Sequence, residues 1–427
     1  MTIPEIHKLF LKTSGIATDT RRIHENSMFV AIKGDRFDAN TFAAEALAKG
    51  ASYVIVDNPE YATGDKTILV EDSLAALQQL AAYHRKQLGI PIVGLTGSNG
   101  KTTTKELINV VLAQKFKTVA TIGNLNNHIG VPLTLLSFKS DTQIGIVEMG
   151  ANHQQEIAFL CAIAAPDLGY ITNFGKAHLE GFGGVEGVIK GKSELYDYLR
   201  GNSGTAIVNT DDPIQVEKTS GIKSFTFGSD AGSDVVITGT TADPFVSSHV
   251  SDLHIKSNLI GAYNASNISA AIAIGKYFGV NDNAIKKAIE AYVPSNNRSQ
   301  IIAKGQGEII LDAYNANPSS MSAATTNFLQ LNKPAKVMVL GDMFELGDES
   351  AAEHADLIKA LSGKDVPVHF IGADFYANRI PGANLYFYPD FETFRSSGTI
   401  PDLIGKTVLI KGSRGMALER ILEDLPA

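Results

Sequence analysis

A glycine-rich stretch in the first quarter of the chain has the residue types of a phosphate-binding loop. The apolar run Ile92–Thr96 precedes it, and Lys105–Leu112, which has helical periodicity, follows it. Glycines let backbone N–H groups converge, and a helix N-terminus favours anions. Lys101 would reach the outer phosphates, and the Thr102 hydroxyl could hold Mg²⁺. The sequence therefore predicts that ATP or GTP binds here.

The glycine spacing of this loop departs from the usual pattern, in which four residues separate two glycines. Here Gly97 and Gly100 enclose two residues, and Gly94 falls one position too early to restore the spacing. An ordinary strand-to-helix turn is the alternative interpretation. We expect nucleotide contacts along the loop from Gly97, Ser98, Asn99, Gly100, Lys101, Thr102 and Thr103.

A carboxylate follows the next β-rich run, Ile144–Met149, where a second magnesium ligand would be needed. Glu148 stands near the end of that run. Mg²⁺ prefers oxygen ligands and keeps several waters, so one hydroxyl, one carboxylate and the ATP phosphates suffice. The alternative is a strand-end carboxylate that caps a helix.

Other polar residues have two interpretations on the residues alone. His178 follows the run Gly169–Thr172 and is either a metal ligand or a structural histidine. Lys192 lies in a helical segment, where a solvated lysine is the ordinary interpretation. Asn126 and Asn127 belong to an amide-rich loop, which either recognises substrate hydroxyls or phosphates or simply forms turns.

The composition indicates a globular protein with real cores. The chain has 427 residues, of which 44% are hydrophobic and 19% charged, with a net charge of −8. No basic tract stands out, so nucleic acid and anionic membranes are poor partner candidates. Cys161 is the one cysteine and lies in an apolar helical run, which indicates a buried thiol. We expect a soluble, cytoplasmic protein without a signal peptide or membrane insertion.

Strand and helix patterns predict an α/β protein of three domains, at roughly 150 residues for each. Residues 1–83 would form a small N-terminal α/β domain, and its last helix, Leu74–Leu88, would take Ser73 as N-cap. Strands are expected there at Met28–Ile32, Tyr53–Val56 and Thr67–Val70.

Residues 84–297 would form a central domain with a parallel, P-loop-type ATP-binding sheet. Polar residues after its strands are site candidates, because ligands bind at the carboxyl ends of parallel strands. The segment Ser220–Ile260 indicates a β meander, and Ala270–Phe278 a helix. Residues 298–427 repeat a strand-then-glycine pattern and predict a Rossmann-like C-terminal domain.

Together these motifs resemble the Mur ligases, ATP-dependent amide-forming enzymes of peptidoglycan precursor synthesis. The compressed loop Thr96–Thr104 is that family's own variant, which accounts for its spacing. Further matches run through all three predicted domains: Gly123–Pro132, Glu148–His153, His178–Gly183, Gly261–Asn267, Asp312–Pro318, Gly341–Gly347 and Lys411–Arg414.

The resemblance implies two Mg²⁺ ions. Thr102 and Glu148 would bind the first, and His178 and Lys192 the second, with Lys192 carrying a carbamate formed with CO₂. Carbamylation turns a cation into an oxygen ligand, and it requires a neutral amine, which burial or nearby positive charge favours. Lys101, Lys192 and His178 would be the catalytic residues.

The resemblance also implies the remaining ligand contacts. ATP would touch Asn264, Asn267, Arg298 and Asp312 in addition to the loop. The other substrates would touch Ser27, Asn126, Asn127, Asn317 and Ser413.

Within the family, Gly341–Gly347 and Tyr314–Pro318 favour the member that joins D-alanyl-D-alanine to UDP-MurNAc-tripeptide through an acyl phosphate. The Asp-Asn-Pro-Arg signature of the member that adds the third amino acid is absent. We expect a monomer, and we expect its domains to close on their ligands because parts of all three must meet. Another amide ligase of the superfamily, such as that third-residue ligase or a folylpolyglutamate-type enzyme, is the first alternative. A regulatory ATPase that makes no amide bond is the second.

Overall fold

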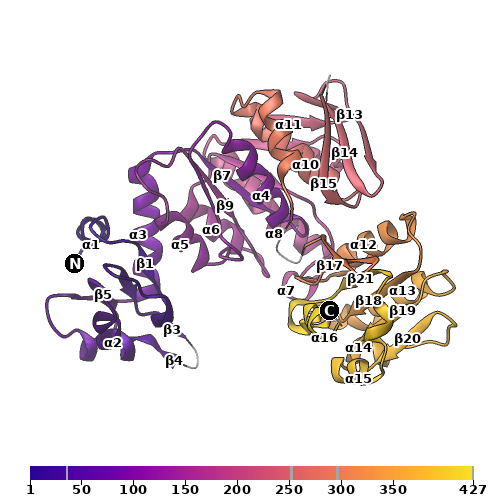
Figure 1. Cartoon of the computed structure of the whole chain (residues 1–427). Helices are drawn as coiled ribbons and strands as arrows, with labels where there is room; N and C mark the ends of the chain where they lie inside the picture. The colour runs from indigo at the N-terminus through magenta and orange to yellow at the C-terminus, as the bar shows by residue number, and fades with distance from the viewer. Residues whose placement is uncertain (35–36, 251–252, 295–297, 426–427) are drawn as a thin grey trace.

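The structure is a computed structural model that describes residues 1–34, 37–250, 253–294 and 298–425. These residues build a four-stranded, a nine-stranded and a six-stranded sheet, each with helices, and a two-stranded hairpin. Figure 1 shows the three main sheets following one another along the molecule, with the N-terminal part at one end and the C-terminal part at the other. The predicted α/β fold class is confirmed.

The N-terminal part is a small parallel sheet in the order β1-β2-β5-β6, beside a hairpin of β3 and β4. Its strands are β1 Ile16–Ala17, β2 Met28–Val30, β3 Lys33–Gly34, β4 Phe37–Asp38, β5 Tyr53–Val56 and β6 Thr67–Leu69. Its helices are α1 Ile3–Phe10, α2 Ala43–Ala48 and α3 Ser73–Leu88.

One detail of helix α3 corrects the sequence prediction. The N-cap is Asp72, whose carboxylate accepts the N–H of Ala75, and Ser73 is already the first helical residue. Aspartate is as good an N-cap as serine. The expectation of a capped N-terminus was therefore right, but the N-cap was placed one residue too late. Gly89 ends the helix with a φ of 61°.

The central sheet has the order β15-β14-β13-β12-β11-β10-β7-β9-β8, and it is parallel from β8 to β13. Its strands are β7 Ile92–Thr96, β8 Thr118–Ala120, β9 Ile144–Glu148, β10 Leu168–Ile171, β11 Thr205–Asn209, β12 Ser224–Gly228, β13 Val235–Ala242, β14 Phe245–Val250 and β15 Leu253–Ile260. The carboxyl ends of β7, β9 and β10 therefore lie side by side.

Helices cover both faces of this sheet. They are α4 Lys101–Leu112, α5 Gly130–Leu136, α6 Glu156–Ala164, α7 Leu179–Phe182, α8 Val185–Gly201, α9 Pro213–Lys218, α10 Asn264–Tyr277 and α11 Asp282–Ala291. Alternate side chains of a strand face opposite ways, so Val93 and Leu95 pack in the core with α4 and α10 while Ile92 packs in the core with α5 and α8. Cys161 is buried in α6, as predicted.

Two expectations for the central part need correction. The segment Ser220–Ile260 is a meander only from β13 onward, because β12 pairs in parallel with both β11 and β13. Residues 251–252 of that segment lie outside the described part. Helix α10 begins at Asn264, earlier than the predicted Ala270, because the apolar pattern gave no sign of the helical turns that carry Asn264 and Asn267.

The C-terminal part is a mostly parallel sheet in the order β16-β17-β21-β18-β19-β20, in which β16 runs antiparallel to β17. Its strands are β16 Gln300–Lys304, β17 Gly307–Asp312, β18 Lys336–Gly341, β19 Val368–Ile371, β20 Leu385–Tyr388 and β21 Thr407–Lys411. Its helices are α12 Pro318–Gln330, α13 Ser350–Leu361, α14 Ala373–Ala377, α15 Phe391–Ser396 and α16 Ile421–Asp424.

The predicted domain limits, 1–83, 84–297 and 298–427, stay predictions. Helix α3 crosses the first limit and packs against α5 and α6 of the central part. The second limit follows Asn297, and residues 295–297 lie outside the described part. Among the described residues, no helix combines the length and apolar character needed to cross a bilayer.

Candidate active site

A cavity of about 750 Å³ lies between the central and C-terminal parts. Of the site residues predicted from the sequence, fourteen line it: Ser98, Asn99, Gly100, Lys101, Thr102, Thr103, Asn126, Asn127, Glu148, His178, Asn264, Asn267, Arg298 and Asp312. Predicted residues up to 214 positions apart (Ser98 and Asp312) therefore line the same cavity.

The phosphate-binding loop joins β7 to α4 at the edge of the cavity. Its glycines adopt φ values of 137° at Gly97 and 79° at Gly100, which L side chains rarely adopt. A Cβ at Gly97 would lie 2.0 Å from the Thr172 hydroxyl oxygen, and one at Gly100 would lie 2.7 Å from Asn267 Oδ1. Both positions thus require glycine for two reasons: a neighbouring side chain lies where a Cβ would be, and the backbone has a positive φ.

Lys101 begins helix α4 and folds back over the loop. Its Nζ donates to the carbonyl oxygens of Gly97 at 2.6 Å and Ser98 at 3.2 Å. Burial lowers the pKa of Lys101 to about 8, against the attraction of Glu148 and aided by the positive charge of Arg298. An anion that replaced the two carbonyls would meet a lysine already held at the helix N-terminus, as phosphate binding requires.

Glu148 ends strand β9 with an exposed fraction of 1%. Its carboxylate accepts from the Thr102 hydroxyl at 3.0 Å and from the Asn126 amide at 2.8 Å. Close approach of Asn126 is possible because Gly150 has no side chain; a Cβ there would lie 2.9 Å from Asn126 Cγ. A hydroxyl and a carboxylate are the oxygen ligands that Mg²⁺ prefers, so these residues fit the predicted ion.

Lys192 lies on α8 with no exposed surface, so the solvated-lysine interpretation is wrong. Its Nζ donates to the Ala151 carbonyl at 3.0 Å and lies 4.7 Å from the centroid of the Phe182 ring. Burial first, and then the charge of Lys101, hold its pKa well below the usual value. The side chain does not line the cavity, although Ala151 does. Burial thus acts against the charged ammonium, in the direction that carbamylation requires.

His178 precedes α7 in a left-handed conformation with a φ of 54° and lines the cavity. Its Nδ1 forms a short hydrogen bond with the carboxylate of Glu345, from the C-terminal part. The hydrogen bond with His178 lowers the pKa of Glu345, and its effect is larger than the opposing effect of burial. His178 is thus joined to Glu345, which does not line the cavity, and not to Glu148.

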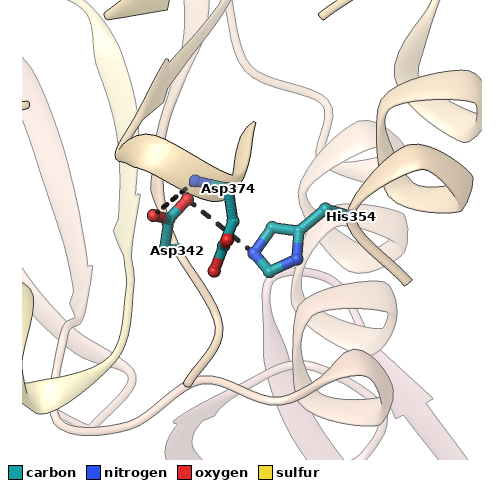
Figure 2. Close-up of side chains that lie close together, drawn as sticks. All are labelled: Asp342, His354 and Asp374. Carbon is teal, nitrogen blue, oxygen red and sulfur yellow. Dashed lines mark hydrogen bonds and ion pairs between the residues drawn. The ribbon is translucent and has the colours of Figure 1, made fainter. Parts of the chain in front are cut away.

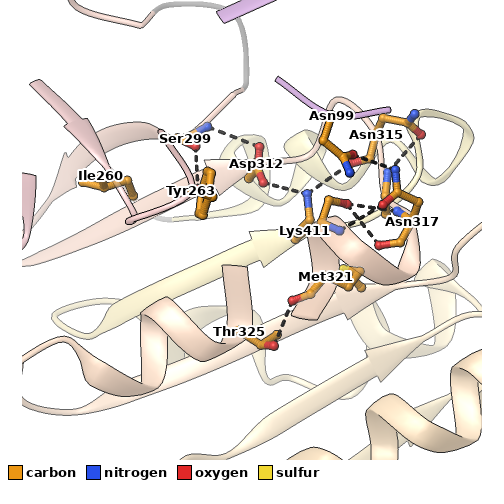
Figure 3. Close-up of polar contacts among 12 residues, drawn as sticks. Asn99, Ile260, Tyr263, Ser299, Asp312, Asn315, Asn317, Met321, Thr325 and Lys411 are labelled. Carbon is orange, nitrogen blue, oxygen red and sulfur yellow. Dashed lines mark hydrogen bonds and ion pairs between the residues drawn. The ribbon is translucent and has the colours of Figure 1, made fainter. Parts of the chain in front are cut away.

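The C-terminal side of the cavity carries a chain of polar contacts, drawn in Figure 3. Tyr263 OH pairs with the Ser299 hydroxyl at 2.9 Å, and the N–H of Ser299 donates to Asp312 at 3.3 Å. Lys411 Nζ then donates to Asp312 at 2.6 Å and to the Asn315 carbonyl at 3.1 Å. Asp312 is thereby fixed at the end of β17, facing the central part.

Arg298, at the start of the C-terminal part, and Asn264 and Asn267, on helix α10 of the central part, also line the cavity. The Arg298 guanidinium stacks 3.8 Å from the centroid of the Tyr314 ring, which is close enough for a cation–π contact. Asn264 donates to the Ile260 carbonyl at 2.8 Å, and Asn267 donates to Asn264 at 2.9 Å. These amides are held in place within α10, beside the phosphate-binding loop.

Five predicted residues do not line the cavity: Gly97, Lys192, Ser27, Asn317 and Ser413. Ser27 is fully buried in the N-terminal part, and its hydroxyl has no hydrogen-bond partner among the described residues. Asn317 caps α12 and donates to Asn99 Oδ1 at 2.7 Å, which joins the C-terminal part to the phosphate-binding loop. Ser413 accepts the N–H of Phe344 at 2.9 Å.

The two asparagines of the amide-rich loop have different roles. Asn126 binds Glu148, whereas Asn127 Oδ1 accepts the N–H groups of Ile129 and Gly130 at the start of α5. Asn127 thus helps to form the turn before α5, and it also lines the cavity.

Sequence reasoning missed several cavity residues, among them Asn173, Tyr263, Tyr314 and Lys411. Asn173 binds the backbone of Asn99 through both ends of its amide. It is the second residue after β10, so the rule that places ligands at strand ends could have found it. The others lie in matched motifs, but their side chains gave no separate signal.

A second cluster of candidate metal ligands, Asp342, His354 and Asp374, lies away from the cavity (Figure 2). Both oxygens of Asp342 accept backbone N–H groups, from Asp374 and Phe375 at 3.0 Å each. His354 Nε2 accepts the N–H of Met343 at 3.1 Å. Because these acceptors are already used, the cluster has a structural explanation: it caps α14 and holds the loop that carries Glu345.

Comparison with known proteins gives the family. The description "Mur ligase middle domain" matches residues 95–275, "Mur ligase, glutamate ligase domain" matches 297–414, and "Mur ligase family, catalytic domain" matches 12–85. The chain belongs to the Mur ligase family.

Relatives of this Mur ligase are similar over nearly their whole length. The UDP-N-acetylmuramoyl-tripeptide–D-alanyl-D-alanine ligase of Bacillus subtilis is 34% identical over 96% of this chain and 93% of its own. The enzyme of the same name from Escherichia coli is 34% identical over 99% and 95%. That from Synechocystis is 37% identical over 98% and 93%. The resemblance noted from the motifs is confirmed. The similarity is to the ligases of this name, which are the MurF members of the family.

Solved structures agree. MurF from Acinetobacter baumannii has a TM-score of 0.86 and 33% identity over 98% of this chain and 97% of its own. MurF from Thermotoga maritima in complex with ADP has a TM-score of 0.84 and 29% identity over 97% of both. A Mycobacterium tuberculosis folylpolyglutamate synthase, at 15% identity and a TM-score of 0.62, shares the fold alone.

Proposed function

We propose that this Mur ligase joins D-alanyl-D-alanine to UDP-MurNAc-tripeptide and converts ATP to ADP and phosphate. One observation supports the proposal most: the phosphate-binding loop, Glu148 and polar residues of the C-terminal part line a single cavity. A ligase needs this arrangement, because the nucleotide, an acid and an amine must meet in one place. The MurF relatives, named for this reaction, support the choice of substrates.

The proposed reaction has two steps. A carboxylate oxygen of the tripeptide attacks the γ-phosphorus of ATP, and the bond to ADP breaks, which gives an acyl phosphate. The amine of D-alanyl-D-alanine then attacks the carbonyl carbon; the C–N bond forms, phosphate leaves and the amine loses a proton. Lys101 lines the cavity and would lie near the phosphoryl oxygens on which negative charge builds, where preorganised positive charge lowers both barriers.

Two Mg²⁺ ions belong to this proposal, and they would supply further positive charge at the phosphates. Thr102 and Glu148, which contact each other at 3.0 Å, would hold one. His178 and a carbamate on Lys192 would hold the other. The low pKa and buried position of Lys192 support carbamylation. His178 would bind through Nε2, because Nδ1 pairs with Glu345.

ATP contacts are proposed for the loop residues and for Asn264, Asn267, Arg298 and Asp312; all of these except Gly97 line the cavity. Substrate contacts are proposed for Asn126 and Asn127 there, and for Ser27, Asn317 and Ser413 beyond it. We place the domains at 1–83, 84–297 and 298–427. We also propose that the enzyme acts as a monomer in the cytoplasm.

Amine-dependent phosphate release tests the proposal. The enzyme is incubated with ATP and UDP-MurNAc-tripeptide, and a panel of amino acids and dipeptides is added one at a time. Release should depend on D-alanyl-D-alanine. Preference for a single amino acid would favour the third-residue ligase or a folylpolyglutamate-type enzyme, and release without any UDP-linked substrate would favour a regulatory ATPase.

A further inference from the structure

Two buried residues, Lys105 and Thr121, lie behind Glu148 and outside the cavity wall. Their exposed fractions are 1% and 2%. Lys105 is on α4, four positions after Lys101, and Thr121 directly follows β8. Because neither side chain reaches the cavity, neither is placed to touch a nucleotide or a substrate directly.

Hydrogen bonds connect both residues to Glu148. Lys105 Nζ donates to the Thr121 carbonyl at 2.6 Å. The Thr121 hydroxyl oxygen accepts the backbone N–H of Glu148 at 3.0 Å, and the Thr121 N–H donates to the Ile146 carbonyl at 3.0 Å. Thr121 is therefore bonded to the two residues of β9 that flank Val147, and its carbonyl is bonded to Lys105 of helix α4.

The Thr121 hydroxyl accepts a backbone N–H of β9 at a point where strand β8 has already ended. Strand β8 ends at Ala120, and the next residue after Thr121, Ile122, is 74% exposed as the chain turns away from β9. Past that point the Glu148 N–H has no backbone carbonyl of β8 beside it. A buried N–H without an acceptor is costly, and the threonine hydroxyl supplies one.

Lys105 fixes the residue that supplies this acceptor. A buried ammonium is costly unless it is paired, and Lys105 has the Thr121 carbonyl and, at 2.9 Å, the carboxylate of Glu106. Thr102, three positions before Lys105 on the same helix, binds the carboxylate of Glu148. Helix α4 thus holds Glu148 twice, directly at its carboxylate and through Thr121 at its backbone.

We propose that Lys105 and Thr121 are positioning residues that hold Glu148 where it serves Mg²⁺. The inference rests on the proposed function, in which Glu148 binds that ion. Partners behind a metal ligand orient it, and their removal typically weakens metal binding about 10- to 100-fold.

The test compares how strongly Mg²⁺ increases ADP affinity in paired variants. Calorimetric titration of ADP with Mg²⁺ and with a chelator gives the ratio of the two affinities. Thr121→Val keeps the shape and removes the hydroxyl, so this ratio should fall about tenfold. Thr121→Ser keeps the hydroxyl and should keep the wild-type ratio. A loss of fold alone would weaken both affinities together and leave their ratio unchanged.

The variant Lys105→Met is a second, independent test of the same affinity ratio. It removes the ammonium at similar length and should also lower the ratio. Lys336→Met is the matched control, because Lys336 binds the backbone carbonyls of Leu329 and Leu331 far from the cavity lining. The inference is overturned if folded Thr121→Val and Lys105→Met both keep the wild-type ratio. If Glu148→Gln keeps it, the metal role of Glu148 in the proposed function fails instead.

Discussion

The lysines around the cavity differ in what surrounds their ammonium groups. Lys411 lies 2.6 Å from the Asp312 carboxylate, whereas Lys192 donates a hydrogen bond to the Ala151 carbonyl. Lys192 is also fully buried and near the positive charge of Lys101, and its pKa is lowered well below the usual value. A lysine in such a place is suited to react as a neutral amine.

Replacing Lys192 should therefore remove activity that a small acid can restore. Lys192→Ala should lower the rate of amide formation at least about 100-fold, because an oxygen ligand for the second ion would be lost. Added formate or acetate should restore part of the rate, as measured by phosphate release. The exposed Lys190, two positions earlier on the same helix, is the matched control. Unchanged turnover of Lys192→Ala would exclude the carbamate.

Strand, glycine turn and helix act as one element at the phosphate-binding loop. The turn is tied down from the neighbouring strand end: the Thr172 hydroxyl donates to the Asn99 carbonyl at 2.5 Å, and Ser98 donates to the Gly175 carbonyl at 2.6 Å. Such ties keep the loop N–H groups in place before any phosphate arrives, which reduces the entropy lost on binding.

A methyl group at Gly97 should disrupt this element. Gly97→Ala puts a Cβ 2.0 Å from the Thr172 hydroxyl oxygen at a φ of 137°, so the loop must move. We expect ADP affinity, measured by calorimetry, to fall by at least about 100-fold with some loss of thermal stability. Gly89→Ala has a positive φ of 61° without a nearby atom and should cost about 1 kcal/mol without changing ADP affinity. Equal ADP affinities in the two variants would contradict this explanation.

Strand β19 carries a titratable group that links stability to pH. His369 is buried between Tyr386 and Phe394, and burial, aided by the charge of Lys406, lowers its pKa from 6.5 to about 4. The unfolded chain therefore takes up a proton below pH 6.5 that the folded chain refuses until about pH 4. Its contribution is complete above pH 6.5 and is lost as the pH falls toward 4, by about 3 kcal/mol in all.

His369→Phe keeps the stacked ring and removes the titration. Chemical unfolding at a series of pH values should give a shallower loss of stability between pH 6.5 and 4 for this variant than for the wild type. Parallel curves over that range would show that His369 does not carry this part of the acid sensitivity.

Much of each element could be predicted because the signals are local. The apolar run Ile92–Thr96, the glycines and the following helix fix the loop, and polar residues at strand ends locate Glu148 and His178 near it. The hydrogen bonds His178–Glu345 and Asn99–Asn317 join residues 167 and 218 positions apart. Residues so far apart leave no periodic pattern in the sequence, so the partners of His178 and Asn317 could not be inferred.

The whole molecule brings the reaction partners together by apposing its central and C-terminal parts. Contacts between them include Asn99 with Asn317 and Lys176 with Glu353, at 2.7 and 2.5 Å. They join at the phosphate-binding loop and beside His178, so occupation of the cavity and the position of the C-terminal part are physically connected. Closure of domains around ligands is a common way to assemble such sites.

Asn317 allows the contact between parts to be separated from helix capping. Asn317→Ala removes both the cap of α12 and the bond to Asn99, and should cost about 1 kcal/mol of stability. Asn317→Asp keeps a good cap but cannot donate to Asn99, so thermal stability should stay near wild type while the KM for ATP rises. If Asp and Ala variants lose stability equally and keep the wild-type KM, the bond to Asn99 has no part in nucleotide binding.

Mass spectrometry of the reaction products tests the central claim most directly. The enzyme, Mg²⁺ and ATP are supplied with UDP-MurNAc-tripeptide and D-alanyl-D-alanine, and all UDP-linked species are weighed. We predict a UDP-MurNAc-pentapeptide formed in equal amount to ADP and phosphate. ATP turnover that leaves the tripeptide unextended would contradict this account.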